Sequence, residues 1–262
     1  MPKIITKSLY NGAVKLNFYP SSHRYKVEGE KEWLTSVTSV TGLVGFPKEI
    51  AMKWAIGLAD THLKEYLNDR EGLIDKSELQ NVIAEALSLY TVRRAEAADV
   101  GTLIHSYAEA FARAKMEGTP PPLIGDDLPE QVLNGINGFL DWYNAHNVKF
   151  LDVERLVYSR SMNYAGLFDA LIEIDGKQML TDWKSSNAVY PEMNFQLAAY
   201  RSAYEEEMSA VNGSLIIRFG KDDGSFEVKD ISDSYFFDVM AFQGLLKVKN
   251  RLKELNRVCP KL

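Results

Sequence analysis

Three charged residues, Asp169, Asp182 and Lys184, lie in two apolar segments that flank the pair Asp175-Gly176. An Asp-Gly pair between alternating segments predicts a two-residue hairpin turn. In the register set by that turn, Asp169 lies directly across from Asp182. Lys184 then shares a face with Asp182, because side chains alternate along a strand. The sequence therefore predicts two carboxylates and an ammonium group on one face of a hairpin.

Two carboxylates in this arrangement need a compensating charge. Directly opposed Cβ atoms lie about 4.5 to 5.5 Å apart, where like charges are destabilising. A divalent cation such as Mg²⁺ or Mn²⁺ suits carboxylate ligands, and a nearby lysine can orient or activate a water. The alternative is a solvated Asp/Lys surface pair, worth at most about 1 kcal/mol. The apolar neighbours Leu171, Leu180 and Trp183 favour the metal site, because they indicate a covered sheet in which unpaired charge is expensive.

Four further elements occur in a specific order around this hairpin. The pattern G-x-x-D followed by D-x-K resembles the PD-(D/E)XK nuclease superfamily, in particular its RecB-like exonuclease branch. Gly101–His105 looks like the G-T-x-x-H element of that branch, Gln196–Tyr200 looks like its Q-x-x-x-Y element, and Glu154 matches its upstream acidic residue. Leu34–Thr38 resembles the S-V-T segment of phage-type and mitochondrial genome maintenance exonucleases, which precedes a helix carrying a tryptophan.

The resemblance implies a metal-dependent DNA exonuclease that prefers single strands or free ends. One or two Mg²⁺ or Mn²⁺ ions would be held by His105, Asp169, Asp182 and the carbonyl of Trp183, with Glu154 as a further ligand. Lys184 would orient the attacking water, and Gln196 and Tyr200, one helical turn apart, would point at the site or the strand end. The expected DNA contacts are Ser36, Thr38, Trp54, Arg93 and Arg94, with Arg155, Arg160 and the lysines of the last helix as further cations.

Two other functions remain open at this point. One is a structure-specific or site-specific DNA endonuclease of the same superfamily, and the other is a non-catalytic nucleic-acid-binding module on the same fold. The resemblance also makes replication or recombination proteins possible partners. The two helical elements favour the exonuclease, whereas a binding module would have no need to concentrate buried like charges.

Composition limits the class of protein. The 262 residues carry a net charge of −6, which argues against bulk electrostatic coating of nucleic acid and leaves room for a local basic groove. A single cysteine, Cys259, excludes an internal disulfide framework and a four-cysteine iron–sulfur cluster. No apolar run is long enough for a signal peptide or a membrane span, so we expect no membrane partner and a cytoplasmic protein of a bacterial or phage-infected cell.

We expect one α/β domain over residues 1–262, with a central mixed sheet flanked by helices and, by resemblance, a restriction-endonuclease-like core. Its parts are an N-terminal β-meander (1–46), a helical region carrying His105 (47–147) and the catalytic core (148–262). Within the meander the strands are expected between 14 and 44. Helices are predicted at Pro47–Leu67, Ser77–Ala97, Asp99–Met116, Leu128–Asn144, Tyr190–Met208 and Ser232–Leu255.

Overall fold

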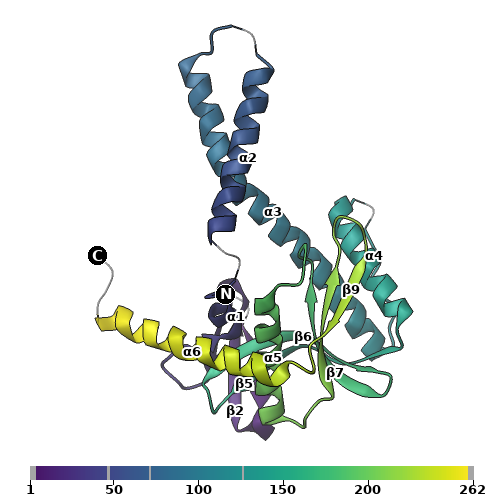
Figure 1. The fold of residues 1–262 in the computed structure, drawn as a ribbon. Helices are drawn as coiled ribbons and strands as arrows, with labels where there is room; N and C mark the ends of the chain where they lie inside the picture. The colour runs from purple at the N-terminus through teal and green to yellow at the C-terminus, as the bar shows by residue number, and fades with distance from the viewer. Residues whose placement is uncertain (1–3, 46–47, 71, 126, 259–262) are drawn as a thin grey trace. The chain divides into compact units, whose positions relative to one another are not determined.

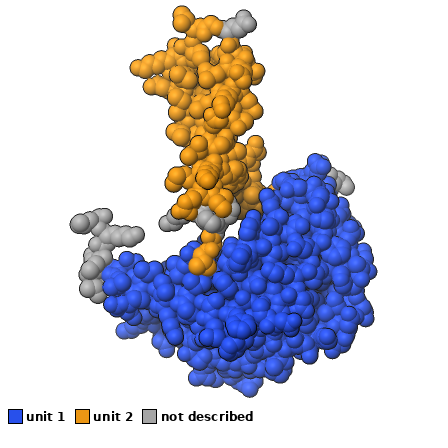
Figure 2. Space-filling model, viewed as in Figure 1, with its two compact units in different colours: residues 1–43, 104–262 blue, residues 44–103 orange. Residues whose placement is uncertain are grey.

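The computed structural model describes residues 4–45, 48–70, 72–125 and 127–258. The chain divides into two compact units, shown in different colours in Figure 2. Unit 1 comprises residues 1–43 and 104–262, and unit 2 comprises residues 44–103. Of the described helices, none is both long enough and apolar enough to cross a membrane.

A small antiparallel sheet opens unit 1. Its strands are β1 (Ile5–Leu9), β2 (Val14–Tyr19) and β3 (Arg24–Val27), with the 3₁₀ turns η1 (Tyr10–Gly12) and η2 (Pro20–Ser22) between them. The predicted bounds of the meander, residues 14 and 44, were wrong at both ends. A strand precedes residue 14, and the two-residue strand β4 (Thr35–Ser36) belongs to the other sheet, where it pairs parallel to β6.

The main sheet of unit 1 has the strand order β4-β6-β7-β8-β9, and β5 pairs with β6. Its further strands are β5 (Val148–Ser159), β6 (Tyr164–Ile174), β7 (Lys177–Lys184), β8 (Gly213–Phe219) and β9 (Phe226–Asp230). The β4–β6 and β7–β8 pairs are parallel and the others antiparallel. This mixed sheet flanked by helices confirms the predicted α/β class (Figure 1).

The central hairpin has the predicted register. Ile174 pairs with Lys177, and the ladder continues without a shift to Ala170 opposite Thr181. Asp175 and Gly176 both have positive φ, at 50° and 73°. A tight turn with two positive φ values matches the right-handed twist of the strands and suits an Asp-Gly pair. The turn therefore fixes the positions of the two aspartates that follow the end of the ladder.

Helices cover both faces of this sheet (Figure 1). α5 (Pro191–Glu207) packs against β5 to β8, and α6 (Tyr235–Val258) and α1 (Val37–Thr41) pack against α5. On the other face α4 (Glu130–Ala145) packs against β8 and β9. Leu180 is buried in one core with Leu197 of α5, whereas the Trp183 ring lies 5.8 Å from that of Phe139 on α4. β7 is therefore buried on both sides, as its apolar residues predicted.

Two predicted helices are one. α3 runs without a break from Lys76 to Glu117, across the expected boundary between Ala97 and Asp99. Neither proline nor glycine interrupts that boundary, so the backbone hydrogen bonds continue through it. Ile104 and Phe111 on this helix are buried, while Tyr107 is only half-buried.

Unit 2 consists of α2 (Lys48–Asn68) and the part of α3 that precedes Ile104. The helix predicted from Pro47 is confirmed from Lys48 onward, and Pro47 itself lies outside the described residues. Trp54 packs edge-on against Tyr90, with ring centroids 5.3 Å apart, and keeps 43% of its surface exposed. The two helices are therefore joined partly by aromatic contacts.

Candidate active site

Asp169 lies one residue beyond the end of the β6–β7 ladder. Its Oδ2 accepts a hydrogen bond from the backbone N–H of Trp183 over 2.5 Å. The carboxylate thus takes the place of a backbone hydrogen bond between β6 and β7, which the ladder does not form beyond Ala170 and Thr181. Burial acts to raise the pKa of Asp169, but His105, Lys184 and the Trp183 N–H together hold it below its usual value. Asp169 is therefore an ionised, fixed carboxylate.

His105 reaches this carboxylate from α3. Its Nδ1 lies 3.6 Å from Oδ1 of Asp169, beyond normal hydrogen-bond length but within ion-pair range. Burial acts to lower the pKa of His105, yet the Asp169 charge outweighs it and the pKa is raised. The imidazole side chain is 33% exposed. The predicted G-T-x-x-H histidine is thus placed beside the first aspartate.

Asp182 and Lys184 form a buried ion pair on β7. Lys184 Nζ lies 2.5 Å from Oδ2 of Asp182, and the Asp182 side chain is only 4% exposed. The contact lacks hydrogen-bond angles, so within the described part of the chain this oxygen accepts no hydrogen bond. Burial raises the pKa of Asp182 to about 6, with Lys184 opposing and Asp169 adding to the increase. Keeping Asp182 charged in this buried position therefore costs free energy.

Two residues of α5 hold Lys184 from its other side. Lys184 Nζ donates to Oε1 of Gln196 over 3.3 Å, and Gln196 Nε2 donates to the Tyr200 hydroxyl over 2.9 Å. Burial acts to lower the pKa of Lys184, but Asp182 and Asp169 raise it overall. Gln196 and Tyr200 thus share a face, as their spacing predicted. Gln196 contacts the lysine, and Tyr200 contacts Gln196.

Glu154 lies beside the first aspartate on the neighbouring strand. Val153 pairs with Ala170 and Arg155 with Phe168, so Glu154 falls opposite Asp169. Its φ of 50° lies in the left-handed region, where a residue other than glycine is strained. Burial first, and then the charge of Asp169, raise the pKa of Glu154 from 4.5 to about 8. The upstream acidic residue of the predicted set is therefore near the site and protonated at neutral pH.

These donors fit a hard divalent cation by their chemistry. The carboxylates of Asp169 and Asp182 and the imidazole of His105 are ligands that Mg²⁺ or Mn²⁺ accepts. As the side chains stand, no three His, Cys, Asp or Glu residues within the described ranges gather into a group that could hold a metal ion. Among the described residues, Asp182 Oδ2 is engaged by the charge of Lys184 alone, which leaves it as the candidate ligand atom.

The predicted DNA contacts are divided between the two units. Ser36 Oγ accepts the backbone N–H of Ser39 and so caps α1, and Thr38 is exposed on that helix. Trp54, Arg93 and Arg94 belong to unit 2, where Trp54 and Arg93 line one hollow with Lys53.

Arg155 is already occupied. It pairs with Asp152 and Glu207 at 3.0 and 3.3 Å, and its side chain is 13% exposed. A largely buried guanidinium that already has two carboxylate partners stabilises the fold. Arg155 is therefore not placed to bind phosphate. Arg160 instead lies over the Tyr10 ring, 5.2 Å from its centroid.

Sequence patterns missed one basic surface. Arg24 and Trp33 are separated in the sequence, yet the guanidinium lies 3.9 Å from the centroid of the indole ring. No sequence motif predicts such a pair, because the pair forms only when β3 and the loop before β4 fold against each other. The one available signal in the sequence was a tryptophan, Trp33, close to Arg24, Lys26 and Lys31.

Comparison of the chain with protein-family models and with curated proteins gave no match.

Proposed function

We propose that this chain is a metal-dependent deoxyribonuclease that hydrolyses phosphodiester bonds from DNA ends. The observation that carries the proposal is the buried Asp182 with the partly buried Asp169 and Lys184, and with His105 beside Asp169. Buried like charges are expensive, and a structural role does not require them at one strand end. Sites that shift several pKa values at once are typical of catalysis. This favours an enzyme over a non-catalytic binding module.

One or two Mg²⁺ or Mn²⁺ ions, bound at this site, would polarise the phosphate and stabilise the leaving oxygen. The chain would hold them with Asp169, Asp182, His105 and the carbonyl of Trp183, and Glu154, which lies opposite Asp169 on β5, would add a carboxylate. Glu154 would have to lose its proton to take part, and a nearby cation favours that loss.

The residues of the chain have distinct tasks in this proposal. Lys184 is held as an ammonium ion by Asp182 and Asp169, so it orients the attacking water and stabilises hydroxide rather than removing the proton itself. Gln196 and Tyr200 position Lys184 through two successive hydrogen bonds. The Trp183 N–H fixes Asp169, so the carboxylate is ready before substrate binds.

The direct test is cleavage of a labelled linear DNA strand by the purified full chain. We expect cleavage with Mg²⁺ or Mn²⁺, none with a chelator, and little with Ca²⁺, which prefers longer and more numerous oxygen contacts. Asp182→Asn should be inactive at the same protein concentration, while Asp230→Asn, an exposed aspartate on β9, should cleave as the parent does. Cleavage that persists in chelator would contradict the proposal.

A further inference from the structure

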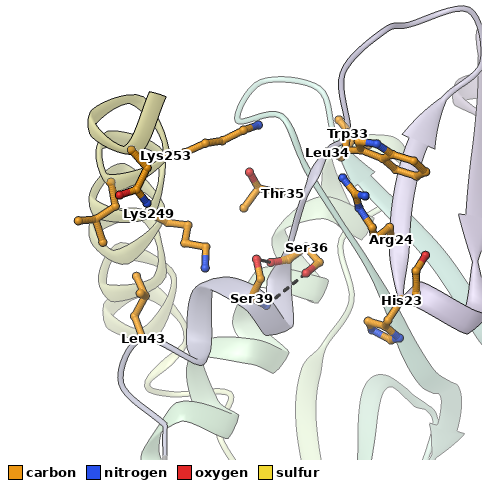
Figure 3. A pocket seen from close by; sticks show the side chains of 13 residues that line it. His23, Arg24, Trp33, Leu34, Thr35, Ser36, Ser39, Leu43, Lys249 and Lys253 are labelled. Carbon is orange, nitrogen blue, oxygen red and sulfur yellow. Dashed lines mark hydrogen bonds between the residues drawn. The ribbon is translucent and has the colours of Figure 1, made fainter. Parts of the chain in front are cut away.

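A groove lies between α6 and the loop that joins β3 to β4. It has a volume of about 600 Å³, and all of its lining residues belong to unit 1. Lys249 and Lys253 extend into it from α6, while Trp33, Arg24 and His23 line the opposite side (Figure 3). Thr35, Ser36 and Ser39 lie between the two walls.

The groove is positively charged in a protein of net charge −6. Its lining includes Arg24, Lys249 and Lys253, and none of its described lining residues is an aspartate or a glutamate. Glu32 pairs with Lys253 at 3.8 Å and with Arg257 at 3.2 Å, and all three are about half exposed or more. Arg24 and Lys249 have no carboxylate in ion-pair range among the described residues. Exposed pairs such as Glu32–Lys253 are worth little, so the groove attracts anions.

Arg24 is held in place without being neutralised. Its guanidinium lies over the Trp33 ring at 3.9 Å from the centroid, and Tyr19 packs edge-on against the same indole at 5.0 Å. A cation–π contact fixes the orientation of an arginine while leaving its N–H donors free. Such a group binds phosphate oxygens in a bidentate manner. The Trp33 wall therefore offers a preformed phosphate-binding cation.

The groove is connected to the candidate active site through a strand pair. Ser36 of β4 pairs with Ala165 of β6, and Asp169 follows four residues later on the same strand. At about 3.3 Å per residue, Ala165 and Asp169 are about 13 Å apart along β6. A bound strand whose reacting phosphate is at Asp169 could therefore place neighbouring phosphates in the groove.

We propose that this groove binds the sugar–phosphate backbone of a single DNA strand, next to the cleavage site. Arg24, Lys249 and Lys253 contact phosphates, and the hydroxyl groups of Thr35 and Ser39 supply uncharged contacts. The choice of DNA as the occupant rests on the proposed nuclease activity. The charge and the open, aromatic-walled shape match the grooves with which proteins track single strands.

The test is a binding measurement without metal, so that no strand is cut. Fluorescence anisotropy of a labelled oligothymidylate about 20 nucleotides long would report binding to the full chain in chelator. For the double variant Lys249→Glu and Lys253→Glu we expect Kd to rise at least about tenfold. The slope of log K against log salt should fall by about 1.4, because each phosphate contact with a single strand contributes about 0.7. Arg24→Ala should weaken binding similarly.

A matched control lies on the same helix. Lys247→Glu with Arg251→Glu has the same charge change and the same spacing, and residues two positions apart point about 200° from each other around a helix. Neither residue lines the groove. We expect a change in Kd of less than about twofold. Equal losses from both pairs, or no loss from the groove pair, would overturn the proposal.

Two further outcomes separate this inference from the nuclease proposal. If the groove variants lose binding as expected while the parent chain cuts no DNA with any metal, the groove proposal is supported and the nuclease proposal is contradicted. If the parent cuts DNA and the groove variants bind DNA as the parent does, the nuclease proposal is supported and the groove proposal is contradicted. Competition by polyglutamate as strong as that by oligothymidylate would show an unspecific anion site and overturn the assignment to a DNA strand.

Discussion

Lys184 Nζ lies 2.5 Å from Oδ2 of Asp182 and 3.3 Å from Oε1 of Gln196. The ammonium group therefore has a carboxylate on one side and a neutral acceptor on the other. The neutral acceptor is itself held by Tyr200. Such an arrangement keeps Lys184 in place if Asp182 turns to another partner.

We expect Lys184→Ala to reduce DNA cleavage by on the order of 10² or more, because the water would lose its orienting charge. Asp182→Ala should have at least the same effect through loss of a ligand. Initial rates on a linear strand with Mg²⁺ would measure both. Lys177→Ala, at the exposed start of the same strand, is the matched control and should retain the parent rate. A folded Lys184→Ala protein with normal activity would show that the lysine has no catalytic role.

His105→Ala should weaken Mn²⁺ binding more than it weakens DNA binding. His105 lies 3.6 Å from Asp169, and His62 in unit 2 lies 3.7 Å from Glu85, so His62→Ala removes an imidazole with a similar carboxylate neighbour. Calorimetric titration of Mn²⁺ into the parent and both variants would compare them. We expect loss of affinity for His105→Ala only. Unchanged Mn²⁺ affinity in both variants would make His105 a packing residue.

Glu154 should make the metal-free protein less stable as the pH rises. Its pKa is raised from 4.5 to about 8 in the folded chain, first by burial and then by the charges of Asp169 and Glu109. Between these values the folded state keeps a proton that the unfolded state has released. The free energy of unfolding therefore falls with increasing pH, by at most about 1.4 kcal/mol per unit. The stability that the protonated group contributes is complete below about pH 4.5 and is lost by about pH 8.

Glu154→Gln should remove the part of this slope that comes from Glu154, while Asp182 and His105, whose pKa values are also raised, keep theirs. In chelator, urea unfolding between pH 5 and pH 8 should show the variant gaining stability relative to the parent as the pH rises. Glu117→Gln, an exposed position at the end of α3, should follow the parent at each pH. Excess Mn²⁺ should flatten the slope of the parent, because a cation favours the charged form. A parent whose stability rises over this range would contradict the shifted pKa.

The hairpin and the positions of its two aspartates were predictable because one turn fixes them. Asp175-Gly176 set the register, and the apolar residues of β7 indicated burial, so the levels of Asp169 and Asp182 followed. The Gln196–Tyr200 alignment followed from helical spacing in the same way. Local rules of turn type and periodicity were enough for these elements.

Other features depend on contacts that local rules do not contain. The switch of Thr35–Ser36 from the small sheet to the parallel pair with β6 involves only two residues, too few to give a pattern. The continuity of α3 was missed because two amphipathic stretches were interpreted as two helices. The Arg24–Trp33 pair forms only when separate segments meet, so the groove could be found only in the folded chain.

The last prediction concerns the form of the DNA. We expect degradation from ends, with single strands or single-stranded tails preferred over blunt duplex. If the groove of about 600 Å³ between α6 and Trp33 binds one backbone as proposed, we expect a duplex to separate before its strand reaches Asp169. In unit 2, the exposed Trp54 beside Lys53 and Arg93 offers a stacking surface, worth about 1 to 3 kcal/mol for each base that uses it.

The measurement offers linear single-stranded, linear duplex, tailed duplex and closed circular single-stranded DNA at equal nucleotide concentration with Mg²⁺. We expect the linear strand to be cut fastest, the tailed duplex next, and the closed circle to remain intact, because it has no end to enter the site. Asp182→Asn on the linear strand controls for contaminating nucleases. If the closed circle is cut as fast as the linear strand, the chain is an endonuclease and entry from an end is wrong. If blunt duplex is preferred, the exonuclease is retained and the single-strand preference is wrong.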